Sequence, residues 1–287
     1  MHTTLVSTDL LASHLGDWAV IDCRFDLQDE HWGREQYRQA HVPGAVYVSL
    51  NDDLSAPPTG MNGRHPLPSI ADLTSLFGRL GIDRSTQVIA YDQDAGSYAS
   101  RLWWSLRYLG HDAVAVLDGG WAKWVREARP VRSGDESRKP AAFTAAPRPA
   151  SRVDLDDVSA HLTDGTRRLV DARAPERFEG RTETIDRVAG HIPGAMNHFF
   201  KQNLDADGTM LPAQRLRENF ERLLGPTSPA DAVMYCGSGV TACHNLLALE
   251  HAGLHGARLY VGSWSEWSSD PARPVETGPA KREQGRS

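Results

Sequence analysis

The sequence predicts an α/β protein made of two tandem domains, and three observations support this prediction. Short apolar runs alternate with segments of helical periodicity, which is typical of βα units and of a mainly parallel sheet flanked by helices. Several motifs occur twice in the same order along the chain. The length of 287 residues is sufficient for two domains of ordinary size.

The repeated motifs show what each half should contain. Residues 20–24 (VIDCR) correspond to 169–173 (LVDAR), and residues 41–45 (HVPGA) correspond to 191–195 (HIPGA). The strand expected at 88–92 corresponds to the strand that ends at Cys236, and 118–124 (DGGWAKW) correspond to 261–267 (VGSWSEW). Each half should therefore contain three strands, an HxPGA turn, two helices and a GxW motif. The paired tryptophans are expected to pack in the core.

Composition shifts separate the expected domains. Residues 127–152 contain four prolines and show no periodicity, as in a linker. We therefore expect an N-terminal domain over 1–126, a linker over 127–152, and a C-terminal domain over 153–270. The remaining tail, 271–287, is poor in apolar residues, so much of it is expected to be mobile.

The overall composition excludes several classes of protein. A net charge of −6 argues against a nucleic-acid-binding surface. The sequence contains neither a signal peptide nor an apolar stretch of about 18 residues, so we expect no membrane association. Cys23, Cys236 and Cys243 form no CxxC pair, which argues against a zinc site and a disulfide framework. Reduced thiols suit the cytoplasm.

The stretch 232–242 (AVMYCGSGVTA) is the candidate reactive loop. A buried strand should end at Tyr235, Gly237 and Gly239 permit a tight turn, and a helix should run from about Thr241 to Ala252. The backbone N–H groups of residues 237–242 can then surround the Cys236 sulfur and favour its thiolate form. We expect an exposed nucleophile there, although a small buried cysteine at a strand end is the alternative.

The first half lacks this thiol. Where the second half has Cys236, the first has Asp92, followed by a loop that is one residue longer. A carboxylate surrounded by N–H donors cannot act as a sulfur nucleophile. The N-terminal domain should therefore be catalytically inactive.

The ordered repeat and this loop resemble the two-domain sulfurtransferases of the rhodanese superfamily over nearly the whole chain. The CGSGVTA loop in particular resembles that of 3-mercaptopyruvate sulfurtransferases. The resemblance implies that Cys236 takes a sulfur from an anionic donor as a persulfide and passes it to cyanide or a thiol. It also implies that no cofactor or metal takes part, and that a reducing protein such as thioredoxin is a possible acceptor. The amides of Gly237, Ser238, Gly239, Val240 and Thr241 would solvate the persulfide.

The same resemblance implies further site residues. Arg177, in the RFEG segment, matches a substrate-binding arginine, because a guanidinium binds a carboxylate or thiosulfonate in a bidentate manner. Arg181 and Arg187 both qualify as the second arginine. Ser238 would bind the keto acid or relay a proton, accompanied by His65 and by an acid that we assign to Asp52 rather than Asp53.

Alternative functions follow from the same residues. Gly237 and Ser238 replace the basic residues of thiosulfate-specific members, which favours 3-mercaptopyruvate over thiosulfate as the donor. A cysteine phosphatase would need an arginine where Ala242 stands. A persulfide carrier that docks to a partner without turnover is the third alternative.

Overall fold

The computed structural model describes residues 1–162 and 164–280, which divide into two compact units. The N-terminal unit comprises Met1–Pro57, Leu67–Pro149 and Leu204–Leu211. The C-terminal unit comprises Pro58–Pro66, Ala150–Asn203 and the chain from Pro212 to the end of the described residues. A short segment of each half of the sequence therefore belongs to the unit formed mainly by the other half.

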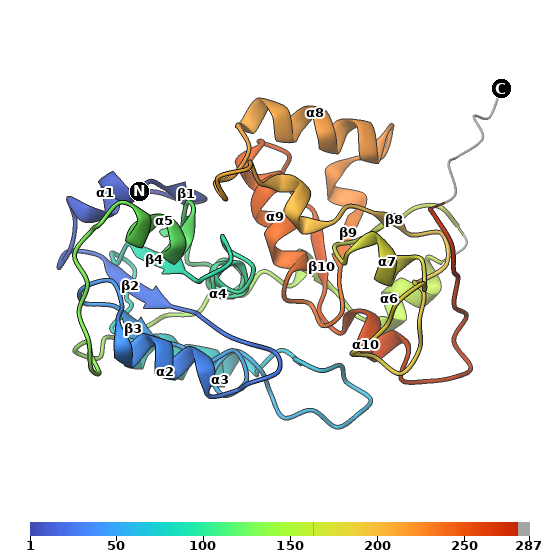
Figure 1. Ribbon diagram of the computed structural model, residues 1–287. Helices are drawn as coiled ribbons and strands as arrows, with labels where there is room; N and C mark the ends of the chain where they lie inside the picture. Colours follow the sequence, from blue (N-terminus) through green and yellow to red (C-terminus); the bar gives the residue numbers. More distant parts are fainter. Residues whose placement is uncertain (163, 281–287) are drawn as a thin grey trace. The chain divides into compact units, whose positions relative to one another are not determined.

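The N-terminal unit contains a five-stranded parallel sheet with strand order β1-β5-β4-β2-β3 (Figure 1). Its strands are β1 (Leu5–Val6), β2 (Ala19–Asp22), β3 (Val46–Tyr47), β4 (Val88–Tyr91) and β5 (Val114–Leu117). Its helices are α1 (Thr8–Ala12), α2 (Trp32–Gln39), α3 (Ile70–Arg79), α4 (Ala99–Tyr108) and α5 (Gly120–Arg126). The central strands β2 and β4 are buried at every residue, which explains why their sequences are apolar apart from Asp22 at the end of β2.

The C-terminal unit repeats this topology with the order β6-β10-β9-β7-β8, again all parallel. Its strands are β6 (Arg152–Val153), β7 (Arg168–Asp171), β8 (Met196–Asn197), β9 (Ala232–Tyr235) and β10 (Arg258–Tyr260). Its α-helices are α6 (Leu155–Ala160), α7 (Pro175–Phe178), α8 (Ala213–Leu224), α9 (Ala242–His251) and α10 (Ser263–Trp267). The 3₁₀ turns η2 (Phe200–Asn203) and η3 (Pro229–Asp231) also belong to this unit, and η1 (Pro149–Ser151) precedes β6. The predicted α/β architecture with a duplicated domain is confirmed.

The repeated Asp–Arg motif stabilises equivalent places in the two units. Arg173 donates a backbone N–H to Asp171, pairs with its carboxylate at 2.7 Å, and lies over the ring of Trp264. In the N-terminal unit, Arg24 makes the same contacts to Asp22 and Trp121. These buried ion pairs tie a strand end to the GxW segment, as expected for residues with a structural role.

The HxPGA histidines are also structural. The Nδ1 atoms of His41 and His191 lie 2.7 Å from the carbonyl oxygens of Tyr37 and Phe178. Each histidine also forms a backbone bridge to a later extended segment, at Arg132 and Glu276 respectively. Neither imidazole belongs to the candidate reactive loop.

The described part of the tail differs from the expectation of a mobile segment. The Trp267 indole donates to the carbonyl of Pro274, Glu276 pairs with His191, and the Gly278 N–H donates to Glu179. The start of the linker binds the N-terminal unit in the same way, because the Trp124 indole donates to Pro130. Trp124 and Trp267, each three residues after the GxW tryptophan, thus hold extended segments that the low apolar content did not indicate. Residues 281–287 lie outside the described residues.

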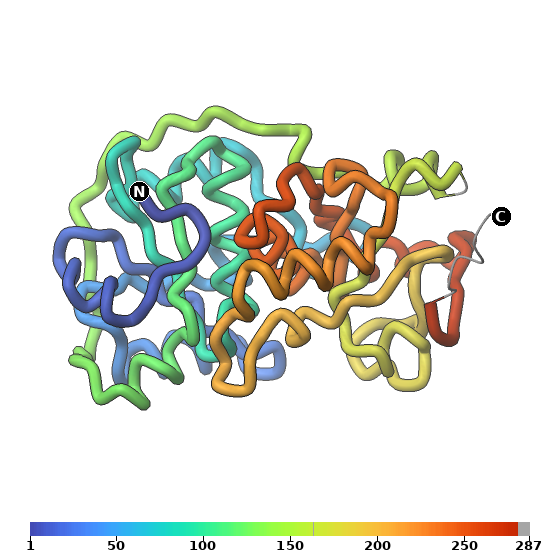
Figure 2. The backbone as a smooth tube through the Cα atoms, turned by 90° about the horizontal axis from the view of Figure 1, so that it is seen from above, coloured from blue at the N-terminus to red at the C-terminus, as the bar shows by residue number. Residues whose placement is uncertain are grey.

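The rest of the linker is extended, as Figure 2 shows. The N–H groups of Ala141 and Ala146 donate to the carbonyls of Gly78 and Leu109, so this stretch follows the N-terminal unit.

None of the helices in the described parts of the chain has the length and apolar character needed to cross a bilayer.

Candidate functional site

The candidate loop begins where two parallel strands end side by side. Tyr235, the last residue of β9, pairs with Asp171, the last residue of β7. Cys236 follows directly, its backbone N–H donates to Ser263 Oγ at 3.1 Å, and its carbonyl accepts from Trp264 at 3.0 Å. The first turn of α10 therefore fixes the position of the cysteine, through the Ser263 hydroxyl and the Trp264 backbone N–H.

The loop then turns sharply into α9. Gly239 has φ +73°, and a Cβ at this position would lie 2.3 Å from the carbonyl oxygen of Val261, so only glycine fits. The carbonyls of Val240 and Thr241 accept from the N–H groups of Cys243 and His244, which forms the first turn of the helix. The predicted strand–loop–helix arrangement is confirmed.

The expected exposure of the Cys236 side chain is wrong. The residue is only 2% exposed, and Ser238 and Val240 in the same loop are also buried. The loop curls over the strand end, and the guanidinium groups of Arg64 and Arg177 lie beside Gly237. These two side chains, 26% and 21% exposed, are the more accessible groups next to the loop.

The equivalent loop of the N-terminal unit holds an anion. The carboxylate of Asp92 accepts from the N–H groups of Asp94 and Gly96 at 2.9 Å, and of Tyr98 and Ala99 at 2.7 Å. Burial raises the pKa of Asp92, and the four N–H donors oppose that shift. A loop at this position in the fold can therefore stabilise a buried negative charge.

Two arginines approach the reactive loop. A Cβ added to Gly237 would lie 2.9 Å from Arg64 Nη2 and 3.7 Å from both terminal nitrogens of Arg177. The Arg64 backbone N–H also donates to Ser265 Oγ at 3.0 Å. Arg177 was predicted from the RFEG segment, whereas Arg64 was missed. The position of Arg64 directly before His65, a predicted site residue, is the sequence feature that could have indicated it.

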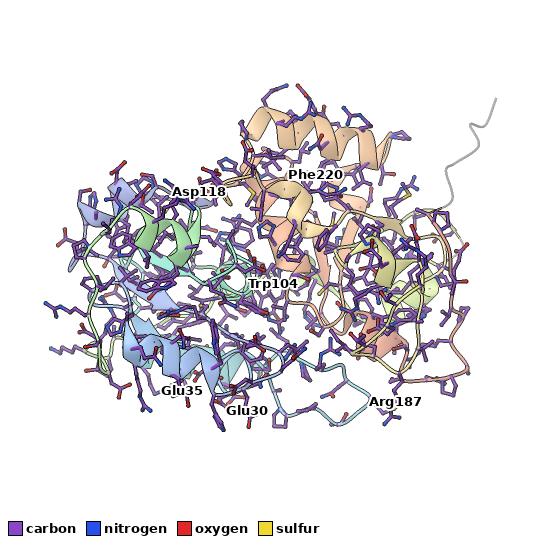
Figure 3. All side chains as sticks on the ribbon, in the orientation of Figure 1. Glu30, Glu35, Trp104, Asp118, Arg187 and Phe220 are labelled. Carbon is purple, nitrogen blue, oxygen red and sulfur yellow. The ribbon has the colours of Figure 1, made fainter. Side chains whose placement is uncertain are left out.

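The other two candidate arginines lie in different surroundings. Arg181 is 58% exposed and pairs with Glu179 and Glu176. Arg187 is also exposed (Figure 3), but together with Arg64 and Asp186 it lines a cavity of about 200 Å³ within the C-terminal unit. Of the two candidates, Arg187 therefore shares a cavity with Arg64.

The predicted serine and histidine meet. His65 Nδ1 lies 2.7 Å from Ser238 Oγ, and both side chains are buried. His65 belongs to the C-terminal unit, although the sequence expectation placed it in the first domain.

Asp52 belongs to the N-terminal unit. Its backbone N–H donates to Ser49 Oγ, and it lines a separate cavity there together with Asp53. Burial raises the pKa of Asp53.

Cys243 is packed on α9, with its sulfur 3.4 Å from the carbonyl oxygen of Gly239. Across residues 1–162 and 164–280, no group of three or more His, Cys, Asp or Glu side chains is arranged to hold a metal ion.

Comparison with known proteins places this arrangement in a family. The rhodanese-like domain model matches residues 7–127 and 154–270. The chain is 45% identical to a probable 3-mercaptopyruvate sulfurtransferase of Pseudomonas aeruginosa, covering 96% of this chain and 98% of the relative. It is 34% identical to the thiosulfate sulfurtransferase of Rattus norvegicus, covering 100% of this chain and 98% of the relative.

A solved structure agrees with this relationship. The crystal structure of SseA from Escherichia coli, described as a 3-mercaptopyruvate sulfotransferase with the rhodanese fold, superposes with a TM-score of 0.78 at 31% identity. The match covers 92% of this chain and 99% of SseA. The chain therefore belongs to the rhodanese family and carries two rhodanese-like domains.

Proposed function

We propose that this protein is a sulfurtransferase that takes sulfur from 3-mercaptopyruvate onto Cys236. The observation that carries the choice of donor is the hydrogen-bonding contact between Ser238 and His65 in the loop that bears the cysteine. A keto-acid donor leaves as an enolate that must be protonated, and a serine–histidine pair can relay that proton. Thiosulfate leaves as sulfite and needs no such step.

The first step is attack of the Cys236 thiolate on the donor sulfur. A new S–S bond forms, the C–S bond breaks, and its electron pair passes to carbon to give the enolate of pyruvate. The proton of the donor thiol passes through Ser238 and His65 to the enolate carbon, which leaves pyruvate and a Cys236 persulfide anion. The amides of Gly237 and the residues up to Thr241 would stabilise that anion, as the equivalent amides hold Asp92.

The second step regenerates the cysteine. A thiolate or cyanide attacks the outer sulfur, the S–S bond breaks, and the electron pair returns to Cys236. Acceptors would include small thiols and a reducing protein such as thioredoxin. We place this reaction in the cytoplasm, where thiols stay reduced.

The carboxylate of the donor would bind to three arginines, Arg177, Arg64 and Arg187. Arg177 and Arg64 flank Gly237, next to the nucleophile, and guanidinium groups suit a carboxylate. Thiosulfate is the alternative donor, because relatives such as the thiosulfate sulfurtransferase of Rattus norvegicus are named for it.

The decisive experiment compares kcat/KM for 3-mercaptopyruvate and thiosulfate on the purified protein, with cyanide and dithiothreitol as acceptors. Mass spectrometry should show a gain of one sulfur atom on Cys236 after incubation with the donor alone. A higher kcat/KM for thiosulfate would overturn the choice of donor. Persulfide formation without turnover would indicate a carrier, and hydrolysis of p-nitrophenyl phosphate that is lost in Cys236→Ser would indicate a phosphatase.

A further inference from the structure

A single carboxylate connects the two arginines beside the reactive loop. Asp186 Oδ1 accepts from Arg64 Nη1 at 2.6 Å, and Asp186 Oδ2 accepts from Arg177 Nη2 at 2.9 Å. The Asp186 side chain is only 4% exposed, so these charge-assisted bonds are sheltered from solvent. All three residues belong to the C-terminal unit.

A second carboxylate, that of Glu183, also pairs with Arg177 and adds a third arginine to the cluster. Glu183 pairs with Arg177 at 2.9 Å and with Arg173 at 3.3 Å, and Arg173 is also paired with Asp171. Burial acts to raise the pKa of Glu183, but hydrogen bonds from the Asp186 backbone N–H, the Arg177 guanidinium and the Ile185 backbone N–H outweigh burial and lower this pKa. The cluster thus contains three guanidinium groups and three carboxylates, so its formal charges cancel before any donor binds.

Arg64 retains hydrogen-bond donors for a further anion. Within the described residues, Arg64 Nε is buried and has no hydrogen-bond partner, while its Nη1 holds Asp186. Nη2 points toward Gly237, next to the nucleophile. An anion at the loop can therefore use Arg64 while Asp186 stays in place, but it then lies near the negative charge of Asp186.

We propose that Asp186 determines donor specificity by charge, admitting monoanionic keto-acid donors and disfavouring dianions such as thiosulfate. This inference rests on the proposed sulfurtransferase function. Repulsion from Asp186 acts once on the carboxylate of 3-mercaptopyruvate and about twice as strongly on a dianion at the same distance. The absence of basic residues at Gly237 and Ser238 removes attraction for a dianion, and Asp186 adds repulsion.

The test measures kcat/KM for both donors in wild type, Asp186→Asn and Asp186→Glu. Asp186→Asn should raise the ratio of thiosulfate to 3-mercaptopyruvate kcat/KM about tenfold, mainly through a lower KM for thiosulfate. Asp186→Glu retains the charge and should keep the wild-type ratio. Glu176→Gln is the matched control, because it removes the same charge from an exposed position on α7.

The outcomes separate this inference from the proposed function. If wild type forms no Cys236 persulfide with either donor, the function itself fails. If the persulfide forms but Asp186→Asn leaves the donor ratio unchanged, or Glu176→Gln shifts it equally, only the role of Asp186 is refuted.

If Asp186→Asn does not fold, competitive inhibition of the wild-type protein provides the test. Pyruvate, a monoanion, should then inhibit more strongly than inorganic sulfate, a dianion. Stronger inhibition by sulfate would contradict the inference.

Discussion

The imidazole Nδ1 of His65 lies 2.7 Å from the hydroxyl oxygen of Ser238. The two residues are far apart in the sequence, but both belong to the C-terminal unit because Pro58–Pro66 packs there. Ser238 is in the loop that follows β9, so this contact joins the imidazole to the loop that carries the candidate nucleophile.

Ser238→Ala should lower kcat for 3-mercaptopyruvate by about 10²-fold and change thiosulfate turnover by less than about threefold. The reason is that only the keto-acid donor leaves as a carbanion that needs a proton. Steady-state kinetics with both donors checks this. Ser238→Thr, which retains a hydroxyl group, is the control. Equal losses for the two donors in Ser238→Ala would refute a role in proton transfer.

Cys236→Ser should abolish persulfide formation and reduce turnover by at least about a thousandfold. The hydroxyl is nearly isosteric with the thiol, so the Tm should change by no more than a few degrees. Mass spectrometry after donor treatment and a thermal melt provide the two measurements. Cys243→Ser is the matched control, because this thiol packs on α9 and should not be needed for turnover. Turnover that persists in Cys236→Ser would exclude a persulfide on this residue.

Arg177→Lys should raise KM for 3-mercaptopyruvate about tenfold while kcat falls less than about threefold. Lysine retains the charge that balances Glu183 and Asp186, but it lacks the planar pair of N–H donors that binds a carboxylate. Arg181→Lys, at the exposed position, should leave both constants unchanged. If Arg181→Lys raises KM and Arg177→Lys does not, the donor carboxylate binds Arg181 rather than Arg177.

The sequence predicted those features that local pattern and duplication determine. The four buried residues of β9, the positive φ of Gly239 and the helix after Thr241 follow from apolar runs and glycine spacing. The anion-holding role of the Asp92 loop follows from its alignment with the Cys236 loop, and four N–H donors confirm it.

Features that depend on tertiary contacts could not be predicted in the same way. The exposure of Cys236 was overestimated because the sequence does not indicate that this loop is buried together with Ser238 and Val240. Arg64 and Asp186 were missed because each lies in an irregular segment and the two are 122 residues apart in the sequence. Their pairing requires the segment 58–66 to pack in the C-terminal unit, which no periodicity indicates.

Asp92→Asn should destabilise the N-terminal unit by about 2 kcal/mol without altering the chemistry at Cys236. The carboxylate accepts four backbone N–H groups, whereas the NH₂ group of asparagine would face two of these donors and leave them unsatisfied. Urea unfolding followed by circular dichroism gives the change in unfolding free energy. Asp29→Asn, at an exposed turn, should have almost no effect. Equal stability of the Asp92→Asn and Asp29→Asn proteins would show that the Asp92 loop does not depend on an anion.

A buried histidine network predicts that acid destabilises the protein. His198 Nε2 lies 2.8 Å from Asn203 Oδ1, and Asn203 Nδ2 donates to Asn245 Oδ1 at 2.7 Å, which links η2 to α9. In this arrangement Asn203 Oδ1 accepts a hydrogen bond from the Nε2–H group of a neutral imidazole. Burial lowers the pKa of His198, and it also lowers the pKa values of His111 and His191.

The sign of the pH dependence follows from proton binding. The unfolded chain binds a proton at each histidine below about pH 6.5, whereas the folded chain does so only at lower pH. The free energy of unfolding is therefore fully retained above about pH 6.5 and falls as the pH drops below it. The slope should reach up to about 1.4 kcal/mol per pH unit for each histidine.

The His198→Gln variant isolates the contribution of one imidazole. Glutamine can still donate to Asn203 but does not titrate, so the stability difference between wild type and variant should shrink between pH 7.5 and pH 5.5. Urea unfolding at a series of pH values measures this difference, and His31→Gln, at an exposed position, serves as the control. If the stabilities of wild type and His198→Gln fall in parallel over this range, the acid sensitivity arises elsewhere, because the one titrating group that distinguishes the two proteins would then contribute nothing.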